Sequence, residues 1–231
     1  PVLLATLLLM LLFWQGLLGK WTVTLRLHPL VVMSHLLGGF ALLSVLWLLL
    51  LRLKPFHIPA CTSQEEKLRP WAILGLLFII LQISLGGWTS ANYAAFVCTD
   101  FPMCQGQWWP PMNFSAGFHL SFNAEQNYEG GVLSTTARTA IQMSHRLGAL
   151  ITTSYLACLI YKLFGTRQGS LLRRIGLILL LLLIIQISLG ALNVLWALPL
   201  LIAMAHNAVA ALLLLSLITL NIYLTLDKGK I

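Results

Sequence analysis

The sequence predicts an all-α integral membrane protein with six transmembrane helices. Of the 231 residues, 59% are hydrophobic and only 9% are charged, whereas soluble domains are about half apolar and about a quarter charged. Six apolar runs approach the roughly 20 residues that a helix needs to cross a bilayer, at about residues 2–18, 30–51, 71–85, 140–164, 175–195 and 200–224. None alternates with the period of two that a barrel strand requires, so the spans should be helices.

The net charge of +8 indicates membrane topology rather than a nucleic-acid partner, because the cations gather in alternate loops. Most follow the second, fourth and sixth runs, namely Arg52, Lys54, Lys67, Arg69, Lys162, Arg167, Arg173, Arg174, Lys228 and Lys230. The other side carries only Lys20, Arg26 and Arg138, with Arg146 just inside a run. By the positive-inside rule the first set is cytoplasmic. We therefore expect a multi-pass protein of the bacterial inner membrane, with residues 88–137 in the periplasm.

The first run begins directly at Pro1, with no charged start and no small-residue cleavage site of the kind that marks a signal peptide. We expect the chain to be the trailing part of a longer protein. The run passes outward and ends in Gln15 and Gly19. The same Gln-x-x-x-Gly pattern closes the third run at Gln82 and Gly86, and the fifth at Gln186 and Gly190.

The second, fourth and sixth runs each carry a histidine near the start: His35, His145 and His206. Each has a methionine two residues before it and glycine or alanine four residues after it, on the same helix face. His35 follows Gly19 by 16 residues, and His206 follows Gly190 by the same interval. The repeating unit is a helical hairpin, and pairs of hairpins would form four-helix bundles with all three histidines near the periplasmic end.

The long loop between the third and fourth runs contains Cys98 and Cys104 and many aromatic residues. An oxidising compartment allows disulfides to persist, so these cysteines could form a structural bridge or a redox-active pair. The aromatic residues suit a cap at the membrane surface. Cys61 and Cys158 are interpreted as plain thiols. The remaining histidines lie in predicted loops without the flanking pattern, and we expect them to be solvated: His28, His57 and His119.

A lone membrane histidine can simply hydrogen-bond a neighbouring helix, but three matched copies favour a ligand. Zinc or copper would usually recruit carboxylates or cysteines, and the spans contain no Asp or Glu. Neutral imidazoles beside small residues suit axial ligation of haem iron, so His35, His145 and His206 are candidate haem ligands. Arg146 could either extend to lipid headgroups or pair with a haem propionate.

Three stretches together resemble the haem A synthase family: residues 22–29 leading to 35–39, residues 98–104 with Gly106 and Trp108, and residues 143–148. The resemblance covers nearly the whole chain. It implies an eight-helix protein of two pseudo-symmetric four-helix bundles, of which six helices are seen here. Residues 1–54 would be the second hairpin of the N-terminal bundle, 55–70 a cytoplasmic linker, and 71–226 the C-terminal bundle with its periplasmic loop 88–137.

The resemblance also implies roles for the histidines. His145 and His206 match the pair that binds a haem b cofactor, with Arg146 beside it, and His35 matches the site of the substrate haem O. The family oxidises the C8 methyl of haem O to a formyl group, with oxygen supplied by water. The family's glutamate falls before residue 1, so no catalytic residue is assigned in this chain. A disulfide between Cys98 and Cys104 would cap the cofactor half.

The implied partners are haem O, the enzyme that makes haem O, the lipid bilayer, and an electron donor or acceptor that the sequence does not identify. Homo-oligomers are left open. The main alternative is a bis-histidine b-type membrane cytochrome that only transfers electrons, for example from quinol. A transporter is a third hypothesis, but transporters usually carry broken spans or charges near the midplane, whereas the polar positions here cluster toward one end.

Overall fold

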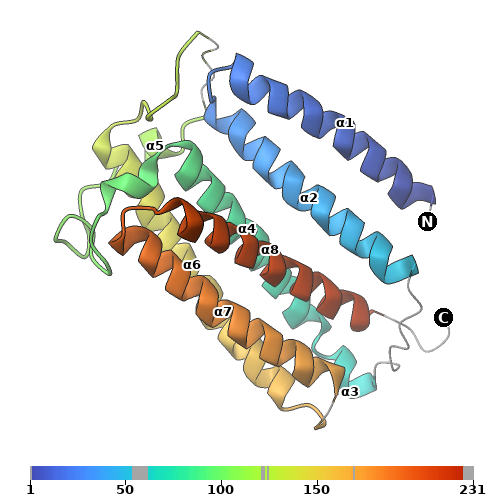
Figure 1. Cartoon of the computed structure of the whole chain (residues 1–231). Helices are drawn as coiled ribbons and strands as arrows, with labels where there is room; N and C mark the ends of the chain where they lie inside the picture. The colour runs from blue at the N-terminus through green and yellow to red at the C-terminus, as the bar shows by residue number, and fades with distance from the viewer. Residues whose placement is uncertain (1, 54–61, 121–122, 124, 169, 226–231) are drawn as a thin grey trace.

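A computed structural model describes residues 2–53, 62–120, 123, 125–168 and 170–225. Six helices in these ranges are long and apolar enough to cross a membrane: α1 (Val2–Thr24), α2 (Pro29–Leu53), α4 (Arg69–Ala91), α6 (Thr135–Phe164), α7 (Leu171–Leu195) and α8 (Leu200–Tyr223). Three short helices connect them, α3 (Ser63–Glu66), η1 (Ala94–Val97) and α5 (Phe114–Gly117) (Figure 1). The predicted all-α membrane fold is confirmed.

Local chemistry explains where several helices begin. The hydroxyls of Ser134 and Ser170 accept hydrogen bonds from the backbone N–H groups of Ala137 and Arg173, which caps α6 and α7. Pro29 is the first residue of α2, a position where the missing proline N–H removes no intrahelical bond. These three long helices therefore start at residues that are suited to a helix N-terminus.

The hairpins α1–α2 and α7–α8 turn in the same way. Arg26 and Leu27 have φ angles of 50° and 61°, and Ala197 and Leu198 have φ angles of 53° and 60°. In both turns the second of these residues donates its backbone N–H five residues back, from Leu27 to Thr22 and from Leu198 to Asn193, over 2.8 Å. The two hairpins, which share a 16-residue interval between glycine and histidine, therefore also share the same backbone turn.

Helices α4, α6, α7 and α8 contact one another in a closed ring, and α2 packs against α4 and α8 on one side of it. In the described part of the chain, α1 packs mainly against α2 and lies at the edge of the molecule (Figure 1). The long loop and the N-termini of α2, α6 and α8 lie at one end, which we call the loop end; the opposite end is the far end (Figure 1). All three candidate histidines therefore lie toward the loop end.

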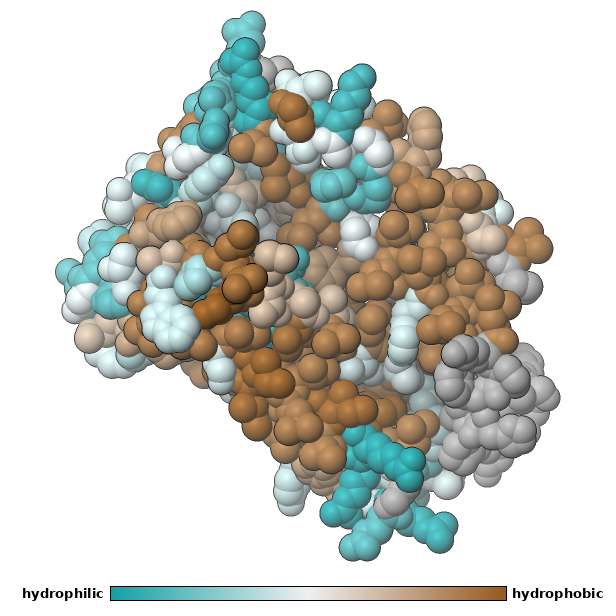
Figure 2. All heavy atoms as spheres, viewed as in Figure 1, coloured by the Kyte–Doolittle hydropathy of each residue, from teal (hydrophilic) through white to brown (hydrophobic). Residues whose placement is uncertain are grey.

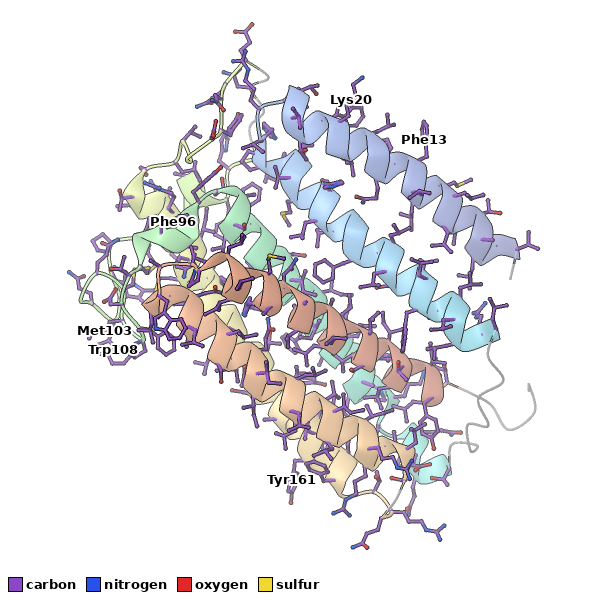
Figure 3. All side chains as sticks on the ribbon, viewed as in Figure 1. Phe13, Lys20, Phe96, Met103, Trp108 and Tyr161 are labelled. Atoms are coloured by element: carbon purple, nitrogen blue, oxygen red, sulfur yellow. A yellow bond between two sulfur atoms is a disulfide. The ribbon has the colours of Figure 1, made fainter. Side chains whose placement is uncertain are left out.

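A leucine-rich core fills the far half of the ring. Its fully buried leucines come from three of the four helices: Leu156, Leu159, Leu163, Leu172, Leu179, Leu213, Leu217 and Leu220. On the outside, Phe13 and Tyr161 are 71% and 79% exposed and point away from the helices (Figure 3). Figure 2 shows hydrophobic atoms over the helices and hydrophilic atoms gathered at both ends, as a lipid-facing surface requires.

The predicted solvation of His28 is wrong. His28 is 2% exposed, and its ring meets the ring of Tyr128 edge-on with centroids 4.7 Å apart. The Tyr128 backbone N–H donates to the Arg26 carbonyl, and the Arg26 guanidinium donates to the Glu125 carbonyl. The long loop thus folds back over the α1–α2 turn and covers His28, a contact between residues about 100 positions apart.

Candidate functional site

The two sequence repeats meet in space, because the glycine near the end of α1, α4 and α7 faces the histidine of the paired helix. A Cβ atom placed on Gly19 would lie 3.2 Å from Cε1 of His35, and one on Gly86 would lie 3.1 Å from Cε1 of His145. The third pair, Gly190 and His206, gives 3.2 Å. In all three copies, Cε1 of the imidazole packs against the glycine of the neighbouring helix, where a larger residue would place a side chain.

The glutamine one turn before each glycine contacts the same ring. The side-chain amide nitrogen of Gln82 lies 3.0 Å from Nδ1 of His145 and donates over 3.0 Å to the His145 carbonyl. With its amide turned to satisfy both groups, Gln15 makes the same pair of contacts with His35, at 2.8 and 3.0 Å. The position of each imidazole is therefore fixed by a glutamine on one side and a glycine on another.

A second glycine, three residues after the histidine, makes room for the glutamine. A Cβ on Gly148 would lie 2.5 Å from Oε1 of Gln82, and one on Gly38 would collide with the amide of Gln15. The residue four after the histidine is not constrained in this way, since a Cβ on Gly39 would meet no atom within 4 Å. The small residue that matters sterically in the first two copies is thus one position earlier than the sequence pattern suggested.

The third copy differs at this position, because Val209 stands where the other copies have glycine. Here the amide nitrogen of Gln186 lies 3.2 Å from Nε2 of His206 instead of reaching Nδ1. Nδ1 of His206 is buried without a hydrogen-bond partner among the described residues. The three sites therefore share the placement of the ring but not the ring nitrogen that the glutamine contacts.

His145 and His206 belong to the four-helix ring, on α6 and α8. His35 lies on α2 and is held by α1, outside that ring. All three side chains are half-buried. This arrangement places two of the predicted ligands in one bundle and the third in a separate hairpin.

The residues fit a haem between His145 and His206. Nε2 of His145 makes no hydrogen bond to any described residue. Nδ1 is contacted by the amide nitrogen of Gln82, and the unpartnered carbonyl oxygen of the same side chain could accept the Nδ1–H of a ligating imidazole after the amide turned. Within the described ranges no three His, Cys, Asp or Glu side chains converge as a protein-only metal site would need. Helices α4, α6 and α7 of the ring carry further buried polar atoms that have no hydrogen-bond partner among the described residues. These atoms are Oε1 of Gln82, Gln142 and Gln186 and Oδ1 of Asn193.

Arg146, next to His145, holds the disulfide loop. Its guanidinium donates to four backbone carbonyls, those of Met103 at 2.7 Å, Asp100 at 3.0 Å, Pro102 at 3.2 Å and Cys98 at 3.4 Å. The predicted bridge between Cys98 and Cys104 is confirmed as a disulfide in this structure. Both terminal nitrogens of Arg146 are thus engaged with the loop, and a role toward a propionate stays a prediction.

The loop is also closed by Asp100. Its carboxylate accepts the backbone N–H groups of Gln105 and Gly106, each over 2.8 Å. The bond from Gly106 is the main reason why the pKa of Asp100 lies below its usual value. The carboxylate stays ionised at neutral pH and fixes the turn between the two cysteines.

Replacing Arg146 with alanine should loosen this loop. One hydrogen bond to a charged group contributes about 1.5–3 kcal/mol, so we expect reduction of the Cys98–Cys104 disulfide to become about tenfold faster or more. The rate can be followed by trapping the free thiols during reduction. Arg26→Ala is the matched control, because the Arg26 side chain donates to the long loop at the Glu125 carbonyl, away from the disulfide. Equal rates in the wild type and the Arg146→Ala variant would contradict the role assigned to Arg146.

The other predicted positions lie away from the histidine pair. His119 is exposed, as expected, on the loop beside α5. Cys158 is a free, exposed thiol. His57 and Cys61 lie outside the described residues. The sequence did not assign a role to Gln15, Gln82 and Gln186, although the repeated Gln-x-x-x-Gly pattern was the signal that could have identified them.

Comparison with known proteins gives a consistent match. A family model described as cytochrome oxidase assembly protein matches residues 1–218. The haem A synthase of Shewanella oneidensis is 48% identical over 215 residues, which cover 93% of this chain and 64% of that protein. The haem A synthases of Neorickettsia sennetsu and Caulobacter vibrioides are 28% and 26% identical over 87% of this chain, and 57% and 56% of theirs. The chain thus spans less than two thirds of the length of each of these three relatives.

Proposed function

The chain belongs to the haem A synthase family of cytochrome oxidase assembly proteins, and we propose that the protein oxidises the C8 methyl group of haem O to a formyl group. The observation that carries the proposal is the pair of imidazoles of His145 and His206, each held by a glutamine and a glycine within one four-helix ring. This pair suits the two axial positions of a haem b.

The residues of the ring have distinct roles in this proposal. His145 and His206 would hold the haem b iron, which supplies one-electron redox chemistry when it is bound. Gln82 and Gln186 orient the two rings. The leucine core closes the far side of the site and keeps it apolar, and a dry surrounding is one of the properties by which a protein sets a haem potential.

His35 is assigned to the substrate. Its ring is held by Gln15 and Gly19 in the same way as His145 is held by Gln82 and Gly86. Nε2 of His35 has no hydrogen-bond partner among the described residues. A second haem bound there would be positioned by a different hairpin from the cofactor, so each macrocycle has its own ligand and can be tested separately.

The membrane orientation and the partners are part of the proposal. The cation distribution supports a periplasmic loop end, where the disulfide can persist. Haem O would be delivered by the enzyme that makes it, and an electron acceptor must take up the electrons that the oxidation releases. Homo-oligomers are compatible with the apolar outer surface. The alternative of a cytochrome that only transfers electrons is less favoured, because all the relatives named above are haem A synthases.

The proposal is tested by supplying haem O to membranes that contain the full-length protein and extracting the haems for chromatography and mass spectrometry. We expect haem A to accumulate, and we expect the purified protein to show a low-spin b-type spectrum. A well-folded protein that contains haem b but forms no haem A would contradict the enzyme proposal and favour the electron-transfer alternative.

A further inference from the structure

We propose that Arg138 binds a propionate of haem b, assisted by the side-chain amides of Gln142 and Asn193, so that the carboxylates of the macrocycle face the loop end. The inference rests on the proposed haem b site and adds the residues that would bind its anionic groups. The sequence suggested Arg146, the neighbour of His145, as a partner of a propionate or of lipid headgroups. The structure favours Arg138, which lies about two turns closer to the loop end.

The inward face of α6 is identified by the leucine core. Leu156, Leu159 and Leu163 are fully buried inside the four-helix ring. Residues three or four apart share a helix face, and steps of this size lead from Leu156 back toward the loop end. The positions reached are Thr152, Ala149, His145, Gln142 and Arg138. Arg138 and Gln142 therefore lie on the same face of α6 as the proposed iron ligand, about 10.5 Å and about 4.5 Å closer to the loop end.

The inward face of α7 is found in the same way. From Leu183 in the leucine core, steps of three or four residues lead to Gln186, Gly190 and Asn193. Gly190 faces the ring of His206, so this side of α7 is turned toward the histidine pair. Asn193 lies one turn beyond that contact, near the end of α7 at the loop end. The inward faces of two neighbouring helices thus become polar at the same end of the ring.

The polar groups on these two faces lack partners in the described part of the chain. Gln142 and Asn193 are only 4% and 9% exposed, yet Oε1 of Gln142 and Oδ1 of Asn193 are buried without a hydrogen bond. Nε of Arg138 is likewise buried without a partner, and its guanidinium forms no ion pair with a described residue. A partly buried cation without a counter-ion is unfavourable. Arg138 therefore needs an anion that the described residues do not supply.

A haem propionate fits this need. The carboxylate matches the planar guanidinium, and the two amides can donate N–H groups to its oxygens. At the far half of the ring the leucine core would leave a carboxylate unpaired, so the loop end is the favourable side for both propionates.

Arg146 is placed differently from Arg138. Its guanidinium already donates to four carbonyls of the disulfide loop. Met143, three residues earlier on the same side of α6, packs against Cys98 and Cys104. This side of the helix faces the loop and not the interior of the ring. Arg146 therefore holds the disulfide loop, and Arg138 is left to bind the anion.

The test is a titration of the detergent-solubilised full-length apoprotein with haemin and with haemin dimethyl ester, whose propionates carry no charge. All proteins carry His35→Ala, so that the low-spin absorption reports only the haem b site. The otherwise unaltered site should bind haemin about 10- to 100-fold more tightly than the ester, as one hydrogen bond to a charged group would give. Arg138→Gln should lose this preference. It should still bind the ester as the unaltered site does, which also shows that the variant is folded.

Further variants separate the contributions to this preference. Arg138→Lys keeps the charge without the planar fork and should retain part of it. Gln142→Leu and Asn193→Leu remove the amides and should each reduce it. Arg26→Ala, at an arginine of the same end that donates to the Glu125 carbonyl, is the matched control and should leave it unchanged.

Three results would overturn the inference. They are equal binding of haemin and the ester by the unaltered site, a full preference for haemin in Arg138→Gln, and loss of the preference in Arg146→Ala alone, which would assign the propionate to that arginine. A protein that gives no bis-histidine spectrum with haemin or with the ester would instead overturn the haem b site itself.

Discussion

Replacing His145 with alanine is expected to abolish the low-spin b-type spectrum of the protein. We propose this imidazole as a haem ligand, because Gly86 and Gln82 hold it in place and the neighbouring Arg146 binds the disulfide loop. Loss of a ligand should exceed the about 100-fold upper effect of losing a residue that only orients one. Absorption and electron paramagnetic resonance of the purified variant measure the result.

His206→Ala should also remove the low-spin signal, because one axial position is then empty. His35→Ala is the control, since His35 lies on α2 and outside the four-helix ring. It should leave the b-type spectrum unchanged and affect only what binds in the α1–α2 hairpin. A normal low-spin spectrum in both the His145→Ala and the His206→Ala variants would refute the assignment of these two residues as ligands.

The sequence predicted the helices and the repeated residues of this site, but it did not predict which residues contact one another. Apolar runs identified all six long helices, because burial in lipid imposes one simple pattern on each. The glutamine–glycine repeat and the histidine repeat were both visible. That Gly86 meets His145, and not some other residue, depends on the register between two helices, which no pattern within one helix determines.

Two differences between the predictions and the structure arise from long-range contacts that the sequence does not reveal. His28 was expected in solvent, but the loop around Tyr128 folds over it. Arg146 was assigned either to headgroups or to a propionate, whereas four carbonyls of the disulfide loop accept from it. In both cases the partner is a loop segment some 40 or more residues away, and an irregular backbone carries no periodicity from which its path could be derived.

Valine in place of Gly86 is expected to remove most of the haem b while leaving the fold intact. A Cβ there would lie 3.1 Å from Cε1 of His145 and within 3.8 Å of both ring nitrogens. Alanine requires a shift of a few tenths of an ångström, whereas the two further methyl groups of valine cannot fit without displacing the imidazole. We therefore expect Gly86→Ala to keep a weakened low-spin spectrum and Gly86→Val to lose it.

Gly190→Val should have the same effect through His206, since the corresponding distance is 3.2 Å. Gly16→Val is the matched control, because a Cβ on Gly16 would meet no atom within 4 Å and the residue lies on an exposed face of α1. Haem content per protein after purification, together with thermal unfolding, separates loss of the site from loss of the fold. If Gly86→Val retained the wild-type spectrum, the contact between this glycine and the His145 ring could not be what places the ligand, and the origin of the paired repeats would have to be sought in helix packing alone.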